Sequence, residues 1–133
     1  MISQRILLVG DDPKIVLLIL KRLSEAGFAV DQAADSEVGL HMASTEPYHT
    51  AIIDIVADKS DGLNFVKKLR RQEIYTPVLI LGAKRAVDDG VKGLEKGDHD
   101  YLSRPFSSCQ ILLHVEMLIR DAPRSTESPL SIV

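Results

Sequence analysis

The stretch that decides the fold is Ile6-Leu7-Leu8-Val9-Gly10-Asp11-Asp12-Pro13, close to the start of the 133-residue chain. Its four consecutive apolar residues indicate a strand that is covered on both faces, as strands are in a parallel sheet. Asp12 followed by Pro13 is typical of a helix start, because aspartate caps the first turn and proline fits the first helical position. The stretch therefore predicts a buried strand that leads directly into a helix.

Outward from this stretch, the same pattern repeats along the chain. Continuous apolar runs at residues 51–53 and 78–81 predict two more buried strands, and residues 28–30 and 100–102 predict weaker strands at the sheet edges. A helix at residues 84–96 is expected to be the least stable, because it contains two glycines. Four other helices have start or stop signals. The first begins at Pro13 and ends before Gly27, and the second begins at Asp35 or Ser36 and ends before Pro47. The third begins at Asp61, and the last begins with a Ser107–Gln110 capping box and ends near Arg120.

Five strands that alternate with helices predict an α/β fold, in which a five-stranded parallel sheet is doubly wound with helices on both faces. We assign residues 1–121 to this single domain. Residues 122–133 contain Pro123, Pro129 and several serines, and we interpret them as a tail or the start of a linker.

Composition narrows the function classes. The net charge of −3 argues against nucleic-acid binding as the main role of this domain. The longest apolar run, residues 15–20, is far shorter than the roughly 20 residues that span a bilayer. The single cysteine, Cys109, excludes an intrachain disulfide and a paired-cysteine zinc site. We therefore expect a cytoplasmic protein that does not associate with membranes.

Two aspartates are expected at the same edge of the sheet. Asp11 follows the first predicted strand, and Asp54 ends the third. In an open parallel sheet, ligands bind beyond the carboxyl ends of the strands, and neighbouring strands lie about 4.8 Å apart. Two carboxylates that close repel each other unless a cation lies between them, and oxygen ligands suit Mg²⁺. A simpler explanation, the helix cap, accounts for Asp12 but not for Asp11, and a buried Asp54 must be paired or coordinated.

A family resemblance rests on four segments that occur in a characteristic order and spacing: residues 6–13, Asp54 with Asp61-Gly62 after it, residues 77–83, and residues 97–106. Over about residues 4–121, the chain resembles the receiver domains of two-component response regulators. The resemblance implies the flavodoxin-like (βα)5 fold with strand order 2-1-3-4-5. It also implies signal output through the face formed by the fourth helix, the fifth strand and the fifth helix.

The resemblance further implies a chemistry. Asp54 would accept a phosphoryl group from the phosphohistidine of a histidine kinase or phosphotransfer protein, and the chain would be no enzyme beyond Mg²⁺-dependent self-phosphorylation and dephosphorylation. The implied Mg²⁺ ligands are Asp11, Asp54 and the backbone carbonyl of Val56, with Asp12 as an additional candidate. Tyr101 matches the aromatic switch position of the family, although an aromatic residue that simply covers the sheet edge explains it equally well.

Four positions depart from the family pattern. Gly10 replaces an acidic residue, and Asp58 replaces the proline that usually follows the phosphorylated strand. Gly82 replaces a serine or threonine whose hydroxyl contacts the phosphoryl group, and such a hydrogen bond is worth about 1.5–3 kcal/mol. Arg104 replaces a lysine, and a planar guanidinium places its donors differently from an ammonium. A simple ion pair with Asp54 is the alternative role of Arg104.

Three functions remain open at this point. The first is a phosphoacceptor receiver, with a first helix that docks the phosphodonor and a fifth helix that joins a homodimer. The second is a degenerate receiver that binds a partner irrespective of phosphorylation. The third is a flavin or nucleotide binder with the same architecture, which is disfavoured because no glycine-rich phosphate loop follows the first strand.

Overall fold

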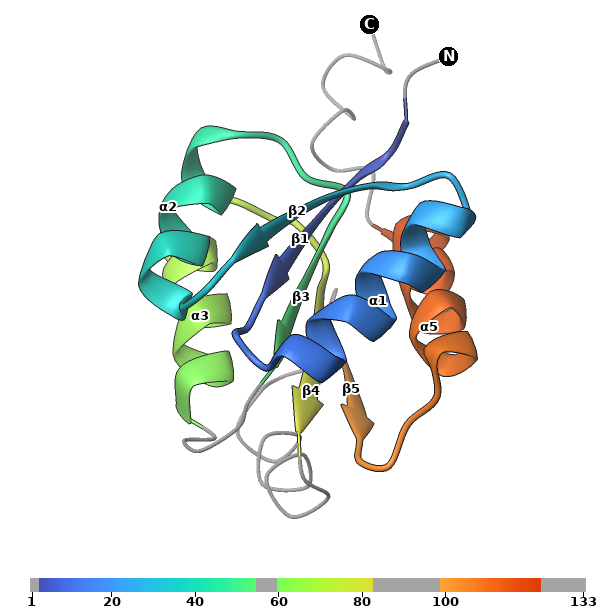
Figure 1. Cartoon of the computed structure of the whole chain (residues 1–133). Coiled ribbons are helices and arrows are strands. Elements are labelled where there is room, and N and C mark those ends of the chain that lie inside the picture. The colour runs from blue at the N-terminus through green and yellow to red at the C-terminus, as the bar shows by residue number, and fades with distance from the viewer. Residues whose placement is uncertain (1–2, 55–59, 83–98, 123–133) are drawn as a thin grey trace, which may run out of the picture.

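The computed structural model describes residues 3–54, 60–82 and 99–122. Its strands form one parallel sheet in the order β2-β1-β3-β4-β5, as predicted (Figure 1). The helix expected at residues 84–96 lies outside the described residues, as do Val56, Asp58 and residues 123–133. The strands are β1 Arg5–Val9, β2 Ala29–Ala33, β3 Thr50–Asp54, β4 Val78–Gly82 and β5 His99–Ser103.

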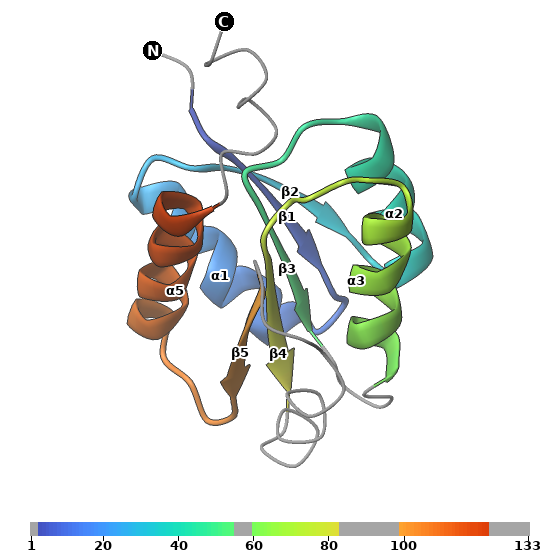
Figure 2. The same ribbon diagram turned by 180° about the vertical axis from the view of Figure 1, so that it is seen from behind.

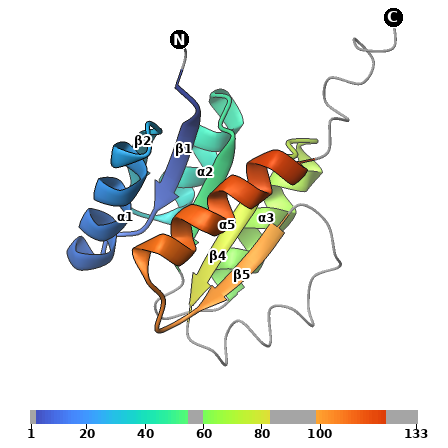
Figure 3. The same cartoon turned by 90° about the vertical axis from the view of Figure 1, so that its right-hand side faces the viewer.

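The described helices cover both faces of the sheet. Helices α1 and α5 lie on one face, and α2 and α3 lie on the other (Figures 1 and 2). Seen from the side, α1 and α5 are separated from α2 and α3 by the strands (Figure 3). None of the helices in the described ranges is long and apolar enough to cross a membrane. The helices are α1 Pro13–Glu25, α2 Ser36–Thr45, α3 Ser60–Arg71 and α5 Ser108–Asp121.

The predicted capping residues begin three of these helices. The Asp12 carboxylate accepts a hydrogen bond from the Lys14 amide at 3.0 Å, and Asp35 caps α2 in the same way. Ser107 and Gln110 form the complete capping box expected at the start of α5. These side chains satisfy amide groups that have no partner within the helix, which explains why the helix starts could be located from the sequence.

Alternation along the strands divides the core into two layers. In β1, Leu7 and Val9 pack beneath α2 and α3, whereas Ile6 and Leu8 pack beneath α1 and α5. All four are at most 2% exposed. Helix α2 approaches β1 closely at Gly39, where an added Cβ would lie 2.6 Å from Val9 Cγ2. The continuous apolar run of β1 therefore reflects burial on both faces, as predicted.

One strand extends three residues beyond its predicted end, whereas the bounds of the other four differ by at most one residue at either end. The strand expected at residues 28–30 is β2, which begins at Ala29 and extends to Ala33 at the sheet edge. The second half of β2 was not predicted, because Asp31 and Gln32 are polar and do not fit an apolar run. In the structure each has a partner: Asp31 pairs with Arg5 and Tyr48, and the Gln32 side chain donates to the Gly10 carbonyl.

Candidate functional site

Asp54 is the last residue of β3, so it lies at the carboxyl ends of the parallel strands, as expected. Val9 and Ile53 are paired across β1 and β3, so Gly10 and Asp54 follow them side by side. A Cβ added to Gly10 would lie 3.2 Å from the Asp54 Cβ. The Asp54 side chain is only 2% exposed. A carboxylate that is this deeply buried requires compensation of its charge.

Arg104 supplies part of that compensation. Its Nη2 donates a hydrogen bond to Asp54 Oδ1 at 2.5 Å, so the ion pair raised as an alternative from the sequence is present. The Arg104 amide donates to the Gly82 carbonyl at 2.8 Å, which fixes the backbone beyond β5. The guanidinium carbon lies 5.4 Å from the centre of the Phe106 ring. The peptide bond between Arg104 and Pro105 is cis.

The electrostatics of Asp54 reflect opposing influences. Burial raises the pKa of the Asp54 carboxyl above its usual value, and Arg104 lowers it. The negative charges of Asp12 and Asp11 also raise the Asp54 pKa, although less than burial does. Asp12 serves mainly as the α1 cap, and Asp11 is exposed beside it.

The second oxygen of Asp54 is left uncompensated. Oδ2 is buried and has no hydrogen-bond partner among the described residues. An orphaned buried carboxylate oxygen fits a site that receives a cation or a reacting group. No group of three or more His, Cys, Asp or Glu side chains within residues 3–54, 60–82 and 99–122 is arranged to hold a metal. Mg²⁺ in proteins is often bound through only one or two carboxylates and keeps several waters, so it does not require such a group.

Gly82 lies on β4, next to β3, and Tyr101 lies on β5, one strand further away. Gly82 ends β4, is buried, and is paired with Ser103 of β5. Tyr101 lies opposite Ile80 and is half-buried against the core layer beneath α2 and α3. Burial raises the pKa of Tyr101 to about 12. Gly82, where a hydroxyl would be expected from the resemblance, has only buried backbone atoms.

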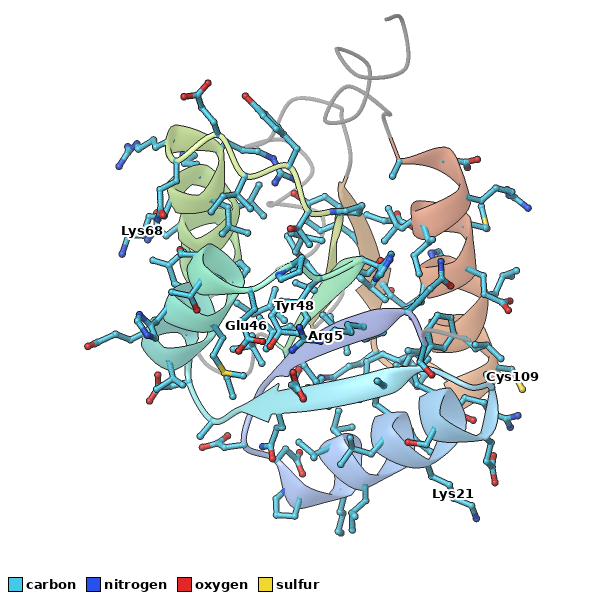
Figure 4. All side chains as sticks on the ribbon, turned by 90° about the horizontal axis from the view of Figure 1, so that it is seen from above. Arg5, Lys21, Glu46, Tyr48, Lys68 and Cys109 are labelled. Atoms are coloured by element: carbon cyan, nitrogen blue, oxygen red, sulfur yellow. The ribbon has the colours of Figure 1, made fainter. Side chains whose placement is uncertain are left out.

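Sequence reasoning missed a polar cluster around Arg5, at the amino end of β1. Arg5 Nη2 donates to Asp31 Oδ2 and to Glu46 Oε1, both at 2.8 Å, and its guanidinium lies 4.8 Å from the centre of the Tyr48 ring. Figure 4 shows Arg5, Glu46 and Tyr48 together. The Arg5 and Tyr48 hydrogen bonds lower the pKa of Asp31. This cluster links β1, β2 and the segment before β3, away from the carboxyl ends of the strands where Asp54 lies.

A second omission is the support of Gly10. The Gln32 amide donates to the Gly10 carbonyl at 2.8 Å, and the Gly10 amide donates to the Ala33 carbonyl at 2.9 Å. Both contacts come from β2, at the sheet edge. They hold the turn that carries Asp11 and Asp12 next to Asp54. Only the register of β2 against β1 could have revealed them, and that register is not visible in the sequence.

Apolar side chains remain exposed on two helices. On α1, Leu17 and Leu18 are 66% and 39% exposed, and on α5, Leu113 and Met117 are 54% and 37% exposed. The long apolar runs of these helices therefore reach their outer surfaces, and do not form only a wide buried face.

Comparisons with known proteins agree with this architecture. The family model described as "response regulator receiver domain" matches residues 6–116. The transcriptional activator protein IrlR of Burkholderia pseudomallei is 42% identical over 116 residues, which cover 87% of this chain and 50% of that protein. The transcriptional regulatory protein TcrA of Mycobacterium tuberculosis is 36% identical over 90% of this chain and 47% of its own length. The chain thus spans about half the length of these curated relatives.

Solved structures that resemble this chain are also receiver domains. The receiver domain of the Francisella response regulator 1452 superposes with a TM-score of 0.75 at 31% identity, covering 89% of this chain and 98% of that one. The receiver domain of the sensor histidine kinase PA1611 of Pseudomonas aeruginosa PAO1, which has magnesium coordinated in its active-site cleft, gives a TM-score of 0.76 at 25% identity, covering 90% and 100%. The parallel sheet, the buried Asp54 at its carboxyl edge and the match over residues 6–116 lead to one conclusion: this chain belongs to the response regulator receiver domain family.

Proposed function

We propose that Asp54 is the phosphoacceptor of this receiver domain and takes its phosphoryl group from the phosphohistidine of a histidine kinase or phosphotransfer protein. The observation that carries this proposal is the buried carboxylate at the end of β3, with Oδ2 unpartnered among the described residues. A carboxylate in a dry site is poorly solvated, and it becomes a nucleophile when an electrophile and a compensating cation are brought to it.

In the proposed reaction, a carboxylate oxygen of Asp54 attacks the phosphorus of the donor. The bond between phosphorus and the histidine nitrogen breaks, its electron pair returns to the imidazole, and Asp54 becomes an acyl phosphate. Arg104 keeps a positive charge beside the carboxylate, where negative charge accumulates. Gly82 can offer only its backbone N–H in place of the usual hydroxyl.

The proposed divalent-cation ligands are Asp11, Asp54 and the backbone carbonyl of Val56, with Asp12 as an additional candidate. A bound Mg²⁺ would neutralise charge on the transferring phosphoryl group. Asp12 is the weaker candidate, because its carboxylate already accepts the Lys14 amide as the cap of α1. Beyond self-phosphorylation and dephosphorylation at Asp54, we propose no enzymatic activity.

A second candidate function is a phosphorylation-independent interaction module. The observation that favours it is the occupation of Asp54 Oδ1 by Arg104 in a site that lacks a carboxylate at Gly10 and a hydroxyl at Gly82. In that case, the exposed apolar residues of α1 and α5 would bind a partner with Asp54 unmodified.

One experiment separates the two functions. The chain is incubated with Mg²⁺ and acetyl phosphate or phosphoramidate, and then with a histidine phosphodonor, and its intact mass is recorded. We expect a single phosphoryl adduct that Asp54→Ala abolishes and that Asp121→Ala, an exposed carboxylate on α5, leaves unchanged. If no donor gives an adduct, the phosphoacceptor proposal is wrong and the interaction module is favoured.

We also propose where the signal leaves the domain. The face that includes β5 and α5 carries Tyr101 and the exposed Leu113 and Met117, and α5 is the proposed homodimer element. Residues 1–121 are the proposed receiver unit, and residues 122–133 the proposed start of a linker or tail. Leu113→Glu should dissociate the dimer in sedimentation experiments, and an unchanged oligomeric state would contradict this role of α5.

A further inference from the structure

The two oxygens of Asp54 have different surroundings. Oδ1 accepts a hydrogen bond from Arg104 Nη2 at 2.5 Å, whereas Oδ2 is buried and has no hydrogen-bond partner in the described part of the chain. Gly10 leaves open the space beside Oδ2, where an added Cβ would lie 3.9 Å away. Within the described residues, the charge of the carboxylate is thus compensated at Oδ1 alone, by Arg104.

Arg104 is held in place at three points, one on its backbone and two on its guanidinium. Its backbone amide donates to the Gly82 carbonyl at 2.8 Å, its Nη2 binds Asp54, and its Cζ lies 5.4 Å from the centre of the Phe106 ring. Planar guanidinium groups stack on aromatic rings and are more weakly hydrated than ammonium groups. Phe106 therefore stabilises the Arg104 side chain in the conformation that reaches Asp54. A lysine at this position would be stabilised less by the same ring.

A divalent cation on Asp54 would be a close neighbour of this guanidinium. Two positive groups that share one carboxylate repel each other strongly in a site where the carboxylate is only 2% exposed. The side chain of Arg104 is 33% exposed, so a path to solvent exists when it leaves. Metal binding and the Arg104–Asp54 ion pair therefore oppose each other.

We propose that Arg104 is a built-in competitor of the divalent cation at Asp54, and that Phe106 is the residue that positions Arg104 for this role. The proposal rests on the proposed function only in taking Asp54 as the metal-binding carboxylate. Its physical consequence is a domain whose metal affinity is set by how firmly an arginine is held at Asp54 Oδ1.

The test measures metal binding to the complete, unphosphorylated chain, with no phosphodonor present. Free Mn²⁺ is followed by electron paramagnetic resonance during titration, and Mg²⁺ is used to displace it. The lost contacts of Arg104 correspond to a change of about tenfold to a hundredfold in an equilibrium constant. We expect Arg104→Gln to tighten Mn²⁺ binding by at least about tenfold and Phe106→Leu to tighten it severalfold. Asp54→Asn should abolish the site.

Matched controls separate competition from a general disturbance. Arg120→Gln removes an exposed arginine of α5 that forms an ion pair with its neighbour Asp121, and it should leave the Mn²⁺ affinity unchanged. Phe28→Leu makes the same change as Phe106→Leu in the core layer beneath α1 and α5, and it should also be neutral. Because Phe106 acts through Arg104, adding Phe106→Leu to Arg104→Gln should change the affinity no further.

The result that overturns the proposal is an Mn²⁺ affinity that Arg104→Gln leaves unchanged or weakens. Additive effects of the two substitutions would overturn the role of Phe106. If a variant fails to fold, the wild-type chain provides the same answer: saturating Mg²⁺ should shift the side-chain Nε–Hε nuclear magnetic resonance signal of Arg104, and an unshifted signal contradicts competition. Failure to form a phosphoryl adduct would overturn the proposed function and leave these metal measurements intact.

Discussion

Replacing Gly10 by aspartate should destabilise the metal-free chain and make its stability depend on divalent cations. An added Cβ would lie 3.2 Å from the Asp54 Cβ, so the new carboxylate would lie within about 5 Å of the buried one. Two like unit charges at that separation repel by about 3 kcal/mol at an effective dielectric constant of about 20. We therefore expect a loss of about 2–4 kcal/mol in the presence of a chelator.

Steric crowding must be separated from charge in this prediction. The Cβ contact is tight enough to require a small shift of Asp54, and Gly10→Ala introduces the same Cβ without a carboxylate. The alanine variant should lose about 1 kcal/mol through overpacking. The difference between the aspartate and alanine variants then isolates the repulsion between carboxylates.

The assay is urea unfolding followed by circular dichroism, with a chelator and with Mg²⁺ in excess. Mg²⁺ binds the folded state of Gly10→Asp better than its unfolded state, so it should recover most of the lost stability, and it should stabilise the wild type much less. Equal losses for the aspartate and alanine variants in chelator, with no recovery by Mg²⁺, would refute the placement of position 10 beside the Asp54 carboxylate.

Three further predictions follow from other parts of the molecule. Combining Gly82→Thr with Arg104→Lys should raise the yield of phosphorylated chain about tenfold, measured by intact mass with a small phosphodonor; a yield equal to the wild type would show that these departures do not limit the reaction. Gly39→Ala should lower the free energy of unfolding by about 1–2 kcal/mol, because its Cβ would lie 2.6 Å from Val9 Cγ2 and the gain in helix propensity offsets only part of the strain; a more stable variant in urea unfolding would contradict this close approach. Burial, together with the Asp31 hydrogen bond in the case of Tyr48, raises the pKa values of Tyr48 and Tyr101 to about 12. The unfolded chain releases these protons near pH 10, so stability should fall as pH rises from 10 to 12, and Tyr48→Phe should reduce that slope.

The sequence predicted the architecture well because the decisive signals are local. The apolar run of β1, the caps Asp12 and Asp35, and the Ser107–Gln110 capping box each depend on neighbours within a few residues. The edge strand β2 was recognised but cut short, because Asp31 and Gln32 are polar and their partners are distant in sequence. Local patterns cannot reveal a hydrogen bond between Gln32 and the Gly10 carbonyl.

The sequence suggested candidate residues for the site but not their geometry. Asp54 and Arg104 were both identified from sequence, and the structure adds that they are directly paired. The approach of Phe106 to the guanidinium depends on side-chain packing, and so does the lack of a partner for Oδ2 among the described residues; spacing in the sequence encodes neither. The Arg5 cluster was missed for the same reason, since it joins residues from three separate segments.

The interior position of β1 in the sheet has a consequence for how the chain is made. This strand is synthesised first, yet it pairs with β2 on one side and β3 on the other. The layer beneath α1 and α5 is completed by Ile111 and Val115, near the end of the described chain. A ribosome adds about 5–20 residues per second, so the first strand waits several seconds for its last packing partners. During synthesis, the four apolar residues of β1 therefore remain incompletely covered until α5 has been made.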